Sequence, residues 1–483
     1  MQQLEEFLLT PWVYRTLVAA YVLTILSLVG IVLSENRNPV KSLAWVTVLL
    51  MFPVGGVVLY LFFGRSIKNK RMISRRNRKR LTELVKPLTE MPDLSKLPVE
   101  ARQQIQLASS LTKSAFYTGN QVEILDSGEK FDALERDIRG AKKFINLQYY
   151  IFSDDKVGRR IKDALIDRAR AGVKIRVIYD HIGSIKTKKK FFKEMQEAGI
   201  DVYPFFRVAF PVFATRINWR NHRKLVVIDG ETGYIGGMNI ADRYIDGGKF
   251  AKWRDAHLRI KGPAVGALQY SFAVDWRFMG RELLDDGMPE SPPEILLPFG
   301  EDTGMHILRS GPTSEWSNIS YMLLKAIGNA KRRVYIQTPY FLPTDALLRA
   351  LQVAALSKVD VRVMIPKKSD SLLLTYSSRS YILECLRAGV KIYLYEGGML
   401  HSKVVIVDDD FSSVGSANID FRSFEHNFEA NMFIYSHKVN SDLTKRFNDD
   451  MKESTRVKES EWRKRPIVHK AIESVLRLLS PVL

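Results

Sequence analysis

The sequence predicts an α/β protein built from two similar halves, with two transmembrane helices in front of them. Three observations indicate this fold class: two uncharged segments near the N-terminus, a strand and helix pattern that occurs twice, and one polar motif that occurs once in each repeat. The chain has 483 residues, of which 46% are hydrophobic, so it can bury the cores of two or three domains.

Charge and cysteine usage limit the classes of partner and site. The formal net charge of +20 favours a partner that carries phosphates, either nucleic acid or an anionic membrane surface. Cys385 is the single cysteine, which excludes an internal disulfide and a multi-cysteine metal site. It lies in a helical pattern, and we expect it to be a small core residue.

The N-terminal region, residues 1–70, is predicted to be a membrane anchor. Thr16 to Leu33 is a stretch of 18 residues without a charge, and Leu43 to Phe63 is a stretch of 21. Each is long enough to cross a hydrocarbon layer of about 30 Å as a helix. The first stretch is not followed by a small-residue cleavage pattern, so a transmembrane helix is favoured over a signal peptide.

Basic residues predict the orientation of these helices. Nine of the sixteen residues from Arg65 to Arg80 are Lys or Arg, whereas the loop from Ser34 to Ser42 has two. The positive-inside rule therefore places the loop outside the cell and the rest of the chain in the cytoplasm. Residues 71–112 are predicted to be a basic juxtamembrane linker, which either binds anionic headgroups or only fixes the topology.

The remaining chain alternates between short β-rich runs and helical patterns, and it does so twice. The first pass runs from "KKFINLQYYIF" at Lys142 to "IDVYPFF" at Ile200, and the second from "KRRVYIQTPYFL" at Lys331 to "KIYLYEG" at Lys391. This pattern predicts βαβ units and mixed sheets flanked by helices. The two halves are expected at residues 113–298 and 299–483, related by a pseudo-twofold axis.

One polar motif closes each half with the same spacing. A histidine, a lysine and an aspartate stand at offsets 0, 2 and 7, and an asparagine follows at offset 17. The first copy consists of His222, Lys224, Asp229 and Asn239, and the second of His401, Lys403, Asp408 and Asn418. On a strand, the histidine and lysine point to one face. The aspartate stands at a turn, where it is expected to brace the loop.

These residue types suit chemistry on a phosphodiester. A neutral imidazole is a nucleophile, and a lysine beside it attracts phosphoryl oxygens. With two copies facing each other, one histidine can attack phosphorus while the other acts as general acid and then general base. The lysines and asparagines would hold the phosphate charge. The sequence has no HExxH pattern or clustered acidic set, and we expect no metal or other cofactor.

The duplicated HxKxxxxD motif resembles that of the phospholipase D superfamily. The resemblance implies two phospholipase-D-like halves, and an acidic residue 25 to 35 positions past each motif that orients the histidine. Asp255 in "KWRDAHLRI" and Glu429 in "EHNFEANM" fit that role, and a surface salt bridge is the alternative for each. By analogy, His222 is the expected nucleophile and His401 the general acid and base, although the two roles could be exchanged.

The chain as a whole is similar to bacterial cardiolipin synthases. The similarity includes the uncharged segments with the following basic run, and the ending "RPIVHKAIESVLRLLSPVL". It implies a multi-pass cell-membrane protein that transfers a phosphatidyl group between two phosphatidylglycerol molecules, giving cardiolipin and glycerol. A phospholipase-D-type hydrolase and a membrane-tethered nuclease are the alternatives, although we expect no nucleic-acid partner. The oligomeric state and the use of phosphatidylethanolamine as donor stay open.

Two further segments carry predictions. The first half has an insertion, Tyr203 to Arg220, rich in Phe and interleaved with Arg. It suits docking of acyl chains and headgroups, but its aromatic residues could equally pack into the core, and bases could also stack on them. The C-terminal segment from Ile467 to Leu479 has one apolar face. We expect a helix packed on the domain by that face, in preference to one that lies on the membrane.

Overall fold

The computed structural model describes residues 11–34, 39–52, 55–57, 60, 94–112, 115–207, 219–284, 303–478 and 480. Contacts divide the chain into two compact units, one of Met1–Ile67 with Val208–Asn218 and one of Lys68–Arg207 with Trp219–Leu483. The predicted boundary between the two halves, at residues 298 and 299, lies outside the described residues.

The N-terminal unit contains two described helices, α2 (Pro11–Ser34) and α3 (Pro39–Met51). Each begins with proline, whose fixed φ suits the first turn of a helix. The first uncharged segment lies within α2, whereas the second is only partly described. Among the described residues, no helix is both long enough and apolar enough for a membrane crossing. The basic run from Arg65 to Arg80 lies outside the described residues.

The first half of the larger unit begins at β1 and ends with α11. Its elements are β1 (Tyr117–Leu125), α7 (Ser127–Gly140), β2 (Phe144–Tyr149), α8 (Lys156–Arg170), β3 (Lys174–Asp180), α9 (Lys189–Glu197), β4 (Asp201–Phe205), β5 (Leu225–Ile228), β6 (Thr232–Gly236), α10 (Arg243–Asp246), β7 (Trp253–Arg254), β8 (His257–Lys261) and α11 (Ala264–Phe278). Polar caps fix some of the helix starts, as where the side chain of Asp155 accepts a hydrogen bond from the Gly158 N–H at the start of α8.

The second half repeats this order. Its elements are β9 (Thr303–Ser310), α12 (Asn318–Gly328), β10 (Arg333–Gln337), β11 (Phe341–Leu342), α13 (Asp345–Leu356), β12 (Asp360–Pro366), α14 (Leu372–Arg379), α15 (Ile382–Arg387), β13 (Lys391–Tyr395), β14 (Met399–Leu400), β15 (Val404–Val407), β16 (Phe411–Gly415), β17 (Ile419–Asp420), α16 (Phe421–Glu425), β18 (Glu429–Tyr435), α17 (His437–Lys452), β19 (Ser454–Arg456), α18 (Glu459–Arg463) and α19 (Ile467–Leu478).

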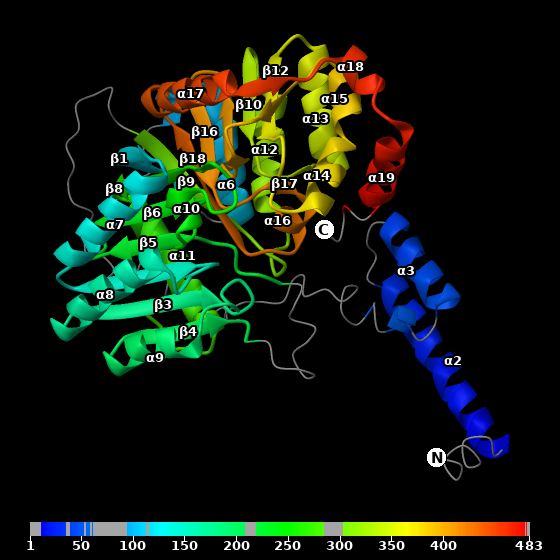
Figure 1. Cartoon of the computed structure of the whole chain (residues 1–483), viewed down its shortest axis with the longest axis horizontal. Helices are drawn as coiled ribbons and strands as arrows, with labels where there is room; N and C mark the ends of the chain where they lie inside the picture. Colours follow the sequence, from blue (N-terminus) through cyan, green and yellow to red (C-terminus); the bar gives the residue numbers. More distant parts are fainter. Residues whose placement is uncertain are drawn as a thin grey trace. The chain divides into compact units, whose positions relative to one another are not determined.

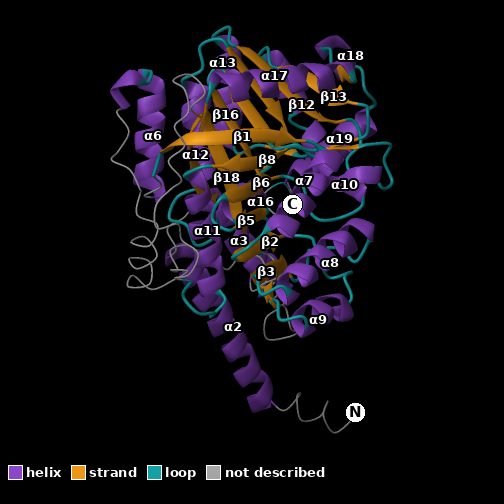
Figure 2. Ribbon diagram, turned by 90° about the vertical axis from the view of Figure 1, so that its left-hand side faces the viewer, coloured by secondary structure: helices purple, strands orange, loops and turns teal. Residues whose placement is uncertain are grey.

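Most of the described strands of both halves join in one continuous sheet (Figures 1 and 2), whereas β11 pairs with β17 and β14 pairs with β7 outside it. Its fifteen strands have the order β19-β13-β12-β10-β15-β16-β18-β9-β1-β8-β6-β5-β2-β3-β4. From the centre outward, the first half reads β1-β8-β6-β5-β2-β3-β4 and the second reads β9-β18-β16-β15-β10-β12-β13. β1 and β9 pair antiparallel at the junction. The predicted mixed α/β fold of two related halves is therefore confirmed, and the two halves share a single sheet.

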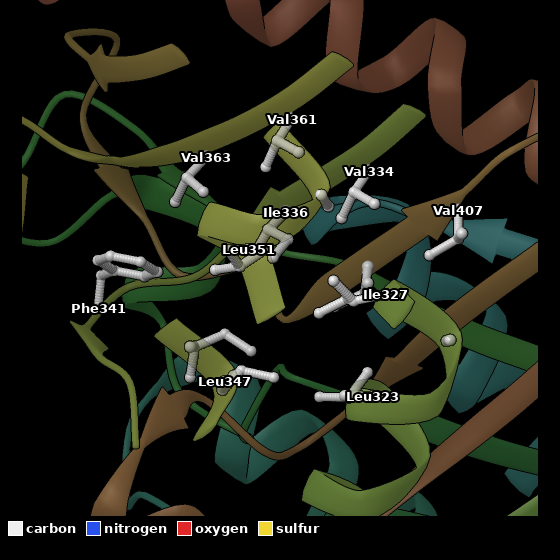
Figure 3. Close-up of a cluster of buried hydrophobic side chains, with 14 of the residues drawn as sticks. Leu323, Ile327, Val334, Ile336, Phe341, Leu347, Leu351, Val361, Val363 and Val407 are labelled. Atoms are coloured by element: carbon white, nitrogen blue, oxygen red, sulfur yellow. The ribbon is translucent and has the colours of Figure 1, made fainter. Parts of the chain in front are cut away.

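Each half has its own hydrophobic core between the sheet and its helices. In the second half, Leu323 and Ile327 of α12 and Leu347 and Leu351 of α13 pack on valines and isoleucines of β10 and β12 (Figure 3). The predicted core position of Cys385 is confirmed, because its side chain is fully buried in this cluster. Burial of such aliphatic side chains is worth about 1.5–3 kcal/mol each.

Part of the segment predicted as a linker is instead structured. Residues 99–112 form α6 (Val99–Thr112), which packs on α12 and β9. Ile105 and Ala108 of this helix belong to the core of the second half. The basic composition of residues 71–112 concealed this element, because the residues of α6 are mostly polar and only a narrow stripe is buried.

The C-terminal helix α19 also differs from the prediction. Its apolar face was expected to pack on the domain, but Ile467, Val468, Val475 and Leu478 are exposed and Glu473 is buried. The amphipathic pattern shows that one face is apolar, but the pattern does not show what covers that face.

The insertion in the first half is described only at its two ends. Phe205, Phe206 and Trp219 pack together with Phe278 and Phe428 in one aromatic cluster. For these residues, packing into the core is the correct alternative. Residues 208–218 lie outside the described residues.

Candidate active site

The two histidines lie at equivalent positions, each three residues before the first residue of a central strand. His222 precedes β5 and His401 precedes β15. The starts of β5 and β15 pair antiparallel with the carboxyl ends of β2 and β10, through Leu225 with Gln148 and Val404 with Gln337. Both motifs therefore lie at the edge of the sheet where the parallel strands end.

Backbone hydrogen bonds hold each histidine against the other half of the protein. The backbone N–H of His222 donates to the carbonyl oxygen of Phe428 at 2.9 Å, and that of His401 donates to the carbonyl oxygen of Arg254 at 2.7 Å. Phe428 and Arg254 come directly before Glu429 and Asp255. The short parallel pair of β14 and β7 continues the second of these contacts. The two halves therefore position each other's motifs.

The side chains pair in the same crossed way. Nδ1 of His222 lies 3.0 Å and 3.1 Å from the two carboxylate oxygens of Glu429. Nδ1 of His401 lies 2.6 Å from Oδ2 of Asp255. The sequence predicts that each acid orients the histidine upstream of it in the same half. That prediction is wrong, because each acid contacts the histidine of the other half. Because a carboxylate accepts, Nδ1 carries the proton and Nε2 keeps its lone pair.

The lysines lie beside the histidines, in the interior of the protein. Nζ of Lys224 donates to the carbonyl oxygen of His222 at 2.5 Å, and Nζ of Lys403 contacts the carbonyl oxygen of His401. Lys403 also lies 2.8 Å from Nδ1 of His401. Both ammonium groups are therefore fixed next to the imidazoles.

Burial and charge shift the pKa values of this cluster. Burial lowers the pKa of Lys224 to about 7 and that of Lys403 to about 8, against the opposing effect of Glu429 and Asp255. Burial also lowers the pKa of both histidines, and His222 is close enough to His401 to contribute to the lowering at His401. The imidazoles are accordingly neutral at neutral pH, which is the nucleophilic form.

The pKa values of the two acids are shifted in opposite directions. Burial raises the pKa of Asp255 to about 6, although Lys403 opposes that shift. Burial also acts to raise the pKa of Glu429, but His222, Lys224 and the hydroxyl of Ser416 outweigh it, so the pKa of Glu429 is lowered. Glu429 is therefore the more firmly ionised of the two acids.

The two motif aspartates lie away from the imidazoles. The carboxylate of Asp229 accepts hydrogen bonds from the backbone N–H groups of Lys142, Lys143 and Phe144 at 2.7–2.9 Å. Asp408 accepts equivalent bonds from residues 331–333. Both have positive φ, of 55° and 48°. Each carboxylate thus ties a turn to the start of β2 or β10.

The two motif asparagines are buried, and each donates one side-chain hydrogen bond within its own half. Nδ2 of Asn239 donates to Tyr244 Oη at 2.7 Å, and Nδ2 of Asn418 donates to Oδ2 of Asp420 at 2.9 Å. An amide nitrogen has two N–H groups, and for each asparagine one of them has a partner among the described residues.

Comparisons with known proteins show which family has this sequence. Residues 134–276 and 323–451 match the family described as "Cardiolipin synthase, PLD-like domain", and residues 22–65 match "Phospholipase_D-nuclease N-terminal". The chain is 41% identical to "Major cardiolipin synthase ClsA" of Bacillus subtilis over 475 residues, covering 96% of this chain and 98% of that protein. The chain belongs to the cardiolipin synthase family. It is also 40% identical to "Cardiolipin synthase 2" of Bacillus cereus, covering 94% and 89% of the two chains.

A solved structure shares the fold of this cardiolipin synthase family member. Phosphatidylserine synthase from Haemophilus influenzae superposes with a TM-score of 0.60, covering 79% of this chain and 100% of that one. The identity is 14%, so the likeness concerns the fold alone.

Three residues near the site of this cardiolipin synthase family member were missed by the sequence analysis. Arg223 binds Asp275 at 2.5 Å and 2.6 Å and donates to the carbonyl oxygen of Glu429, so it links the halves. Ser416 bonds to the carboxylate of Glu429, and the ring of Tyr150 lies 4.9 Å from that of His222. Arg223 and Ser416 differ between the repeats, where Ser402 and Gly237 stand instead, so the search for repeated residues did not find them.

Proposed function

We propose that this chain is a phosphatidyltransferase that makes cardiolipin and glycerol from two molecules of phosphatidylglycerol through a phosphohistidine. The observation that supports the reaction is the pair of imidazoles, each held at Nδ1 by an acid of the other half, with a buried lysine beside each. Membership of the cardiolipin synthase family supports the substrate.

In the first step, Nε2 of His222 attacks phosphorus and the bond from phosphorus to the glycerol headgroup oxygen breaks. His401 donates its Nε2 proton to the departing glycerol oxygen. The bound phosphodiester raises the pKa of the imidazole that faces it, because its negative charge favours the protonated form. The ammonium groups of Lys224 and Lys403 neutralise the charge on the non-bridging oxygens.

In the second step, His401 takes the proton from the terminal hydroxyl of the second phosphatidylglycerol. The resulting oxygen attacks phosphorus, the bond to His222 breaks, and cardiolipin leaves. We assign the nucleophile to His222 by analogy with related enzymes in which the first half supplies it, and the carboxylate of Glu429 at Nδ1 would stabilise the cationic phosphorylated imidazole. Asn239 and Asn418 would donate their remaining N–H groups to the phosphate.

Labelled phosphatidylglycerol in vesicles tests this function. The full-length protein should form labelled cardiolipin and glycerol over many turnovers, and His222→Ala and His401→Ala should form no cardiolipin. Samples of His401→Ala denatured in alkaline detergent, where an N–P bond survives, should retain a labelled protein if His222 is the nucleophile, with at most one glycerol released per protein, because attack still occurs at a reduced rate without the leaving-group proton. Phosphatidic acid as the sole product would indicate a hydrolase, and digestion of nucleic acid without lipid turnover would indicate a nuclease.

We also propose that residues 16–33 and 43–63 cross the cell membrane and leave the catalytic part in the cytoplasm. The uncharged length of both segments, the basic run after them and the match of residues 22–65 support this topology. Cysteine accessibility provides a test because the single native cysteine, Cys385, is fully buried. Asn38→Cys should react with an impermeant maleimide in intact cells, and Asn77→Cys should react only after the membrane is opened. The reverse pattern, or equal reactivity, would contradict the topology.

A further inference from the structure

The C-terminal helix α19 is attached to the protein through its polar side. The carbonyl oxygen of Leu476 accepts a hydrogen bond from Ser377 of α14, and His469 packs 5.9 Å from the ring of Tyr376. Arg477 bonds to Glu384 of α15, and its guanidinium lies over Tyr381. Ordinary surface helices place the apolar stripe on the core, so α19 is inverted relative to that rule.

The apolar stripe of α19 faces away from the protein. Five of its large apolar side chains are between 39% and 81% exposed, namely Ile467, Val468, Ile472, Val475 and Leu478. α14 lies beside α19 (Figure 1) and adds Leu372 and Leu373, which are 76% and 52% exposed. These seven exposed residues lie on two adjacent helices, and we call them the α14–α19 surface. A patch of this kind indicates a binding surface.

The charges around this surface suit an anionic membrane. The one acidic residue of α19, Glu473, is buried and bound by Arg465 at 2.6 Å and 2.9 Å, so it presents no negative charge outward. Exposed basic residues stand before each helix: Lys368 before α14 and Lys464 before α19, together with Lys367 and Arg463, which pair with Glu396 and Glu459. Apolar residues flanked by cations are the composition of helices that lie in a membrane interface.

The start of α14 lies near the candidate active site. Asp370, two residues before α14, is exposed and bonds to Tyr340 Oη at 2.6 Å. It is close enough to His401 and Lys403 to raise the pKa of both. Leu372 and Leu373, which follow Asp370 by two and three residues, are therefore exposed side chains close to the site. A phospholipid that stays in the membrane can reach the site only if the edge of the site lies at the level of the headgroups.

We propose that the α14–α19 surface inserts into the interfacial layer of a phospholipid bilayer and holds the opening of the active site against the headgroups. The inference rests on the proposed lipid substrate. The occupant is the bilayer itself, with acyl chains around the leucine, isoleucine and valine side chains and anionic headgroups on the flanking lysines and arginines. Such a helix buries its apolar face by about 5–10 Å.

Depth-dependent fluorescence quenching tests the contact with lipid. The full-length protein carrying Val475→Cys or Leu372→Cys is labelled with a polarity-sensitive fluorophore and reconstituted into vesicles of phosphatidylglycerol and phosphatidylcholine. Cys385 is fully buried, so protein without an added cysteine should remain unlabelled. Leu356→Cys is the matched control, because Leu356 is 63% exposed and is the last residue of α13. The chain continues from there into the start of β12, at the opposite end of that strand from the site.

Nitroxide groups on the acyl chains should quench the label at residues 475 and 372 but not at 356, and aqueous iodide should show the opposite pattern. Iodide quenching at all three positions would overturn the proposal. Protection from both quenchers at 475 and 372 would also overturn it, because another protein surface would then cover the face. If dilution into more lipid restores quenching by the lipid nitroxides, the covering surface belongs to a second copy of the protein. If dilution does not restore it, the covering surface is another part of the same chain.

Activity measurements separate this inference from the proposed function. Val468→Asp combined with Val475→Asp should lower kcat/KM on vesicles by about tenfold or more and change it less than about twofold in detergent micelles, where the substrate no longer lies in a bilayer. Leu356→Asp should change neither value. Quenching measured on the His401→Ala background should persist even though no cardiolipin forms. Equal activity of the double variant and Leu356→Asp on vesicles would contradict the proposal.

Discussion

Nδ1 of His401 lies 2.6 Å from Oδ2 of Asp255, which belongs to the other half of the protein. The same relationship holds between His222 and Glu429, so each half supplies a histidine to one pair and an acid to the other. A single half of this chain contains neither complete pair. Duplication of the fold is therefore a requirement of the proposed chemistry, because each half orients the imidazole of the other.

Removal of the orienting charge should impair catalysis without unfolding the protein. Asp255→Asn and Glu429→Gln keep the shape of the side chain but no longer specify the Nδ1–H tautomer, and an outer partner of this kind is worth about 10²- to 10⁴-fold in rate. We expect kcat to fall by such a factor, as measured by cardiolipin formation in vesicles. Unchanged thermal unfolding would exclude a merely structural effect, and kcat within a few fold of the native value would contradict the orienting role.

Close packing behind Asp255 provides a second test. A Cβ atom at Gly237 would lie 2.1 Å from Oδ1 of Asp255, so the carboxylate must move if alanine is introduced. Gly237→Ala should lower kcat and destabilise the protein by about 1–3 kcal/mol, the usual cost of overpacking. Chemical denaturation and the vesicle assay measure the two effects.

Gly128→Ala is the matched control for this substitution. Gly128 lies in α7 with no atom within 4 Å of the added methyl group, and alanine favours the helix by about 0.5–1 kcal/mol. Its activity should remain unchanged. A Gly237→Ala protein as active and stable as Gly128→Ala would show that Asp255 tolerates displacement.

The sequence was sufficient to locate the main strands of each half and the two copies of the polar motif. Strand periodicity located β2, β3, β10 and β12, because their runs are apolar and bounded by turns. The shared offsets of His222 and His401 located the two motifs because a duplicated fold places equivalent residues at equivalent points. Both the strand positions and the motif positions are therefore contained in local sequence patterns.

Contacts between the halves could not be derived from strand periodicity or from motif spacing. The pairing of Glu429 with His222 depends on how the halves meet across β1 and β9, and no spacing within one strand encodes it. The outward direction of Val475 in α19 depends on polar contacts made by the opposite face. α6 was missed because its buried stripe is only Gln104, Ile105 and Ala108.

The lysines predict the alkaline limb of the pH profile. Burial lowers the pKa of Lys224 to about 7 and that of Lys403 to about 8. A lysine is charged below its pKa and neutral above it, so affinity for the phosphate should fall as pH rises through this range. The value of kcat/KM, which reports the free enzyme, should therefore decrease above about pH 7–8.

Lys224→Arg distinguishes this explanation from a general effect of alkali. Guanidinium keeps its charge throughout the range, so the contribution of residue 224 to the alkaline decrease should disappear, even if the absolute rate is lower. A profile of kcat/KM against pH in vesicles measures the difference. An alkaline limb identical to that of the native protein would show that Lys224 does not titrate there.

Asp229 and Asp408 provide the last prediction, which separates a structural role from a role in proton transfer. The carboxylate of Asp229 binds three backbone N–H groups and its own backbone has φ of 55°, a conformation that asparagine tolerates and alanine does not. Asp229→Ala should lower the free energy of unfolding by about 2 kcal/mol or more, through lost charge-assisted hydrogen bonds and backbone strain.

Asp229→Asn should be milder, because its amide oxygen still accepts hydrogen bonds and its backbone fits the turn. If the role is structural, both variants should keep most of the native kcat per folded molecule at a temperature where they remain folded. The vesicle assay, corrected by circular dichroism for the folded fraction, measures this value. Loss of kcat in a fully folded Asp229→Asn protein would place the carboxylate in the reaction, and Asp408→Asn repeats the test in the second half.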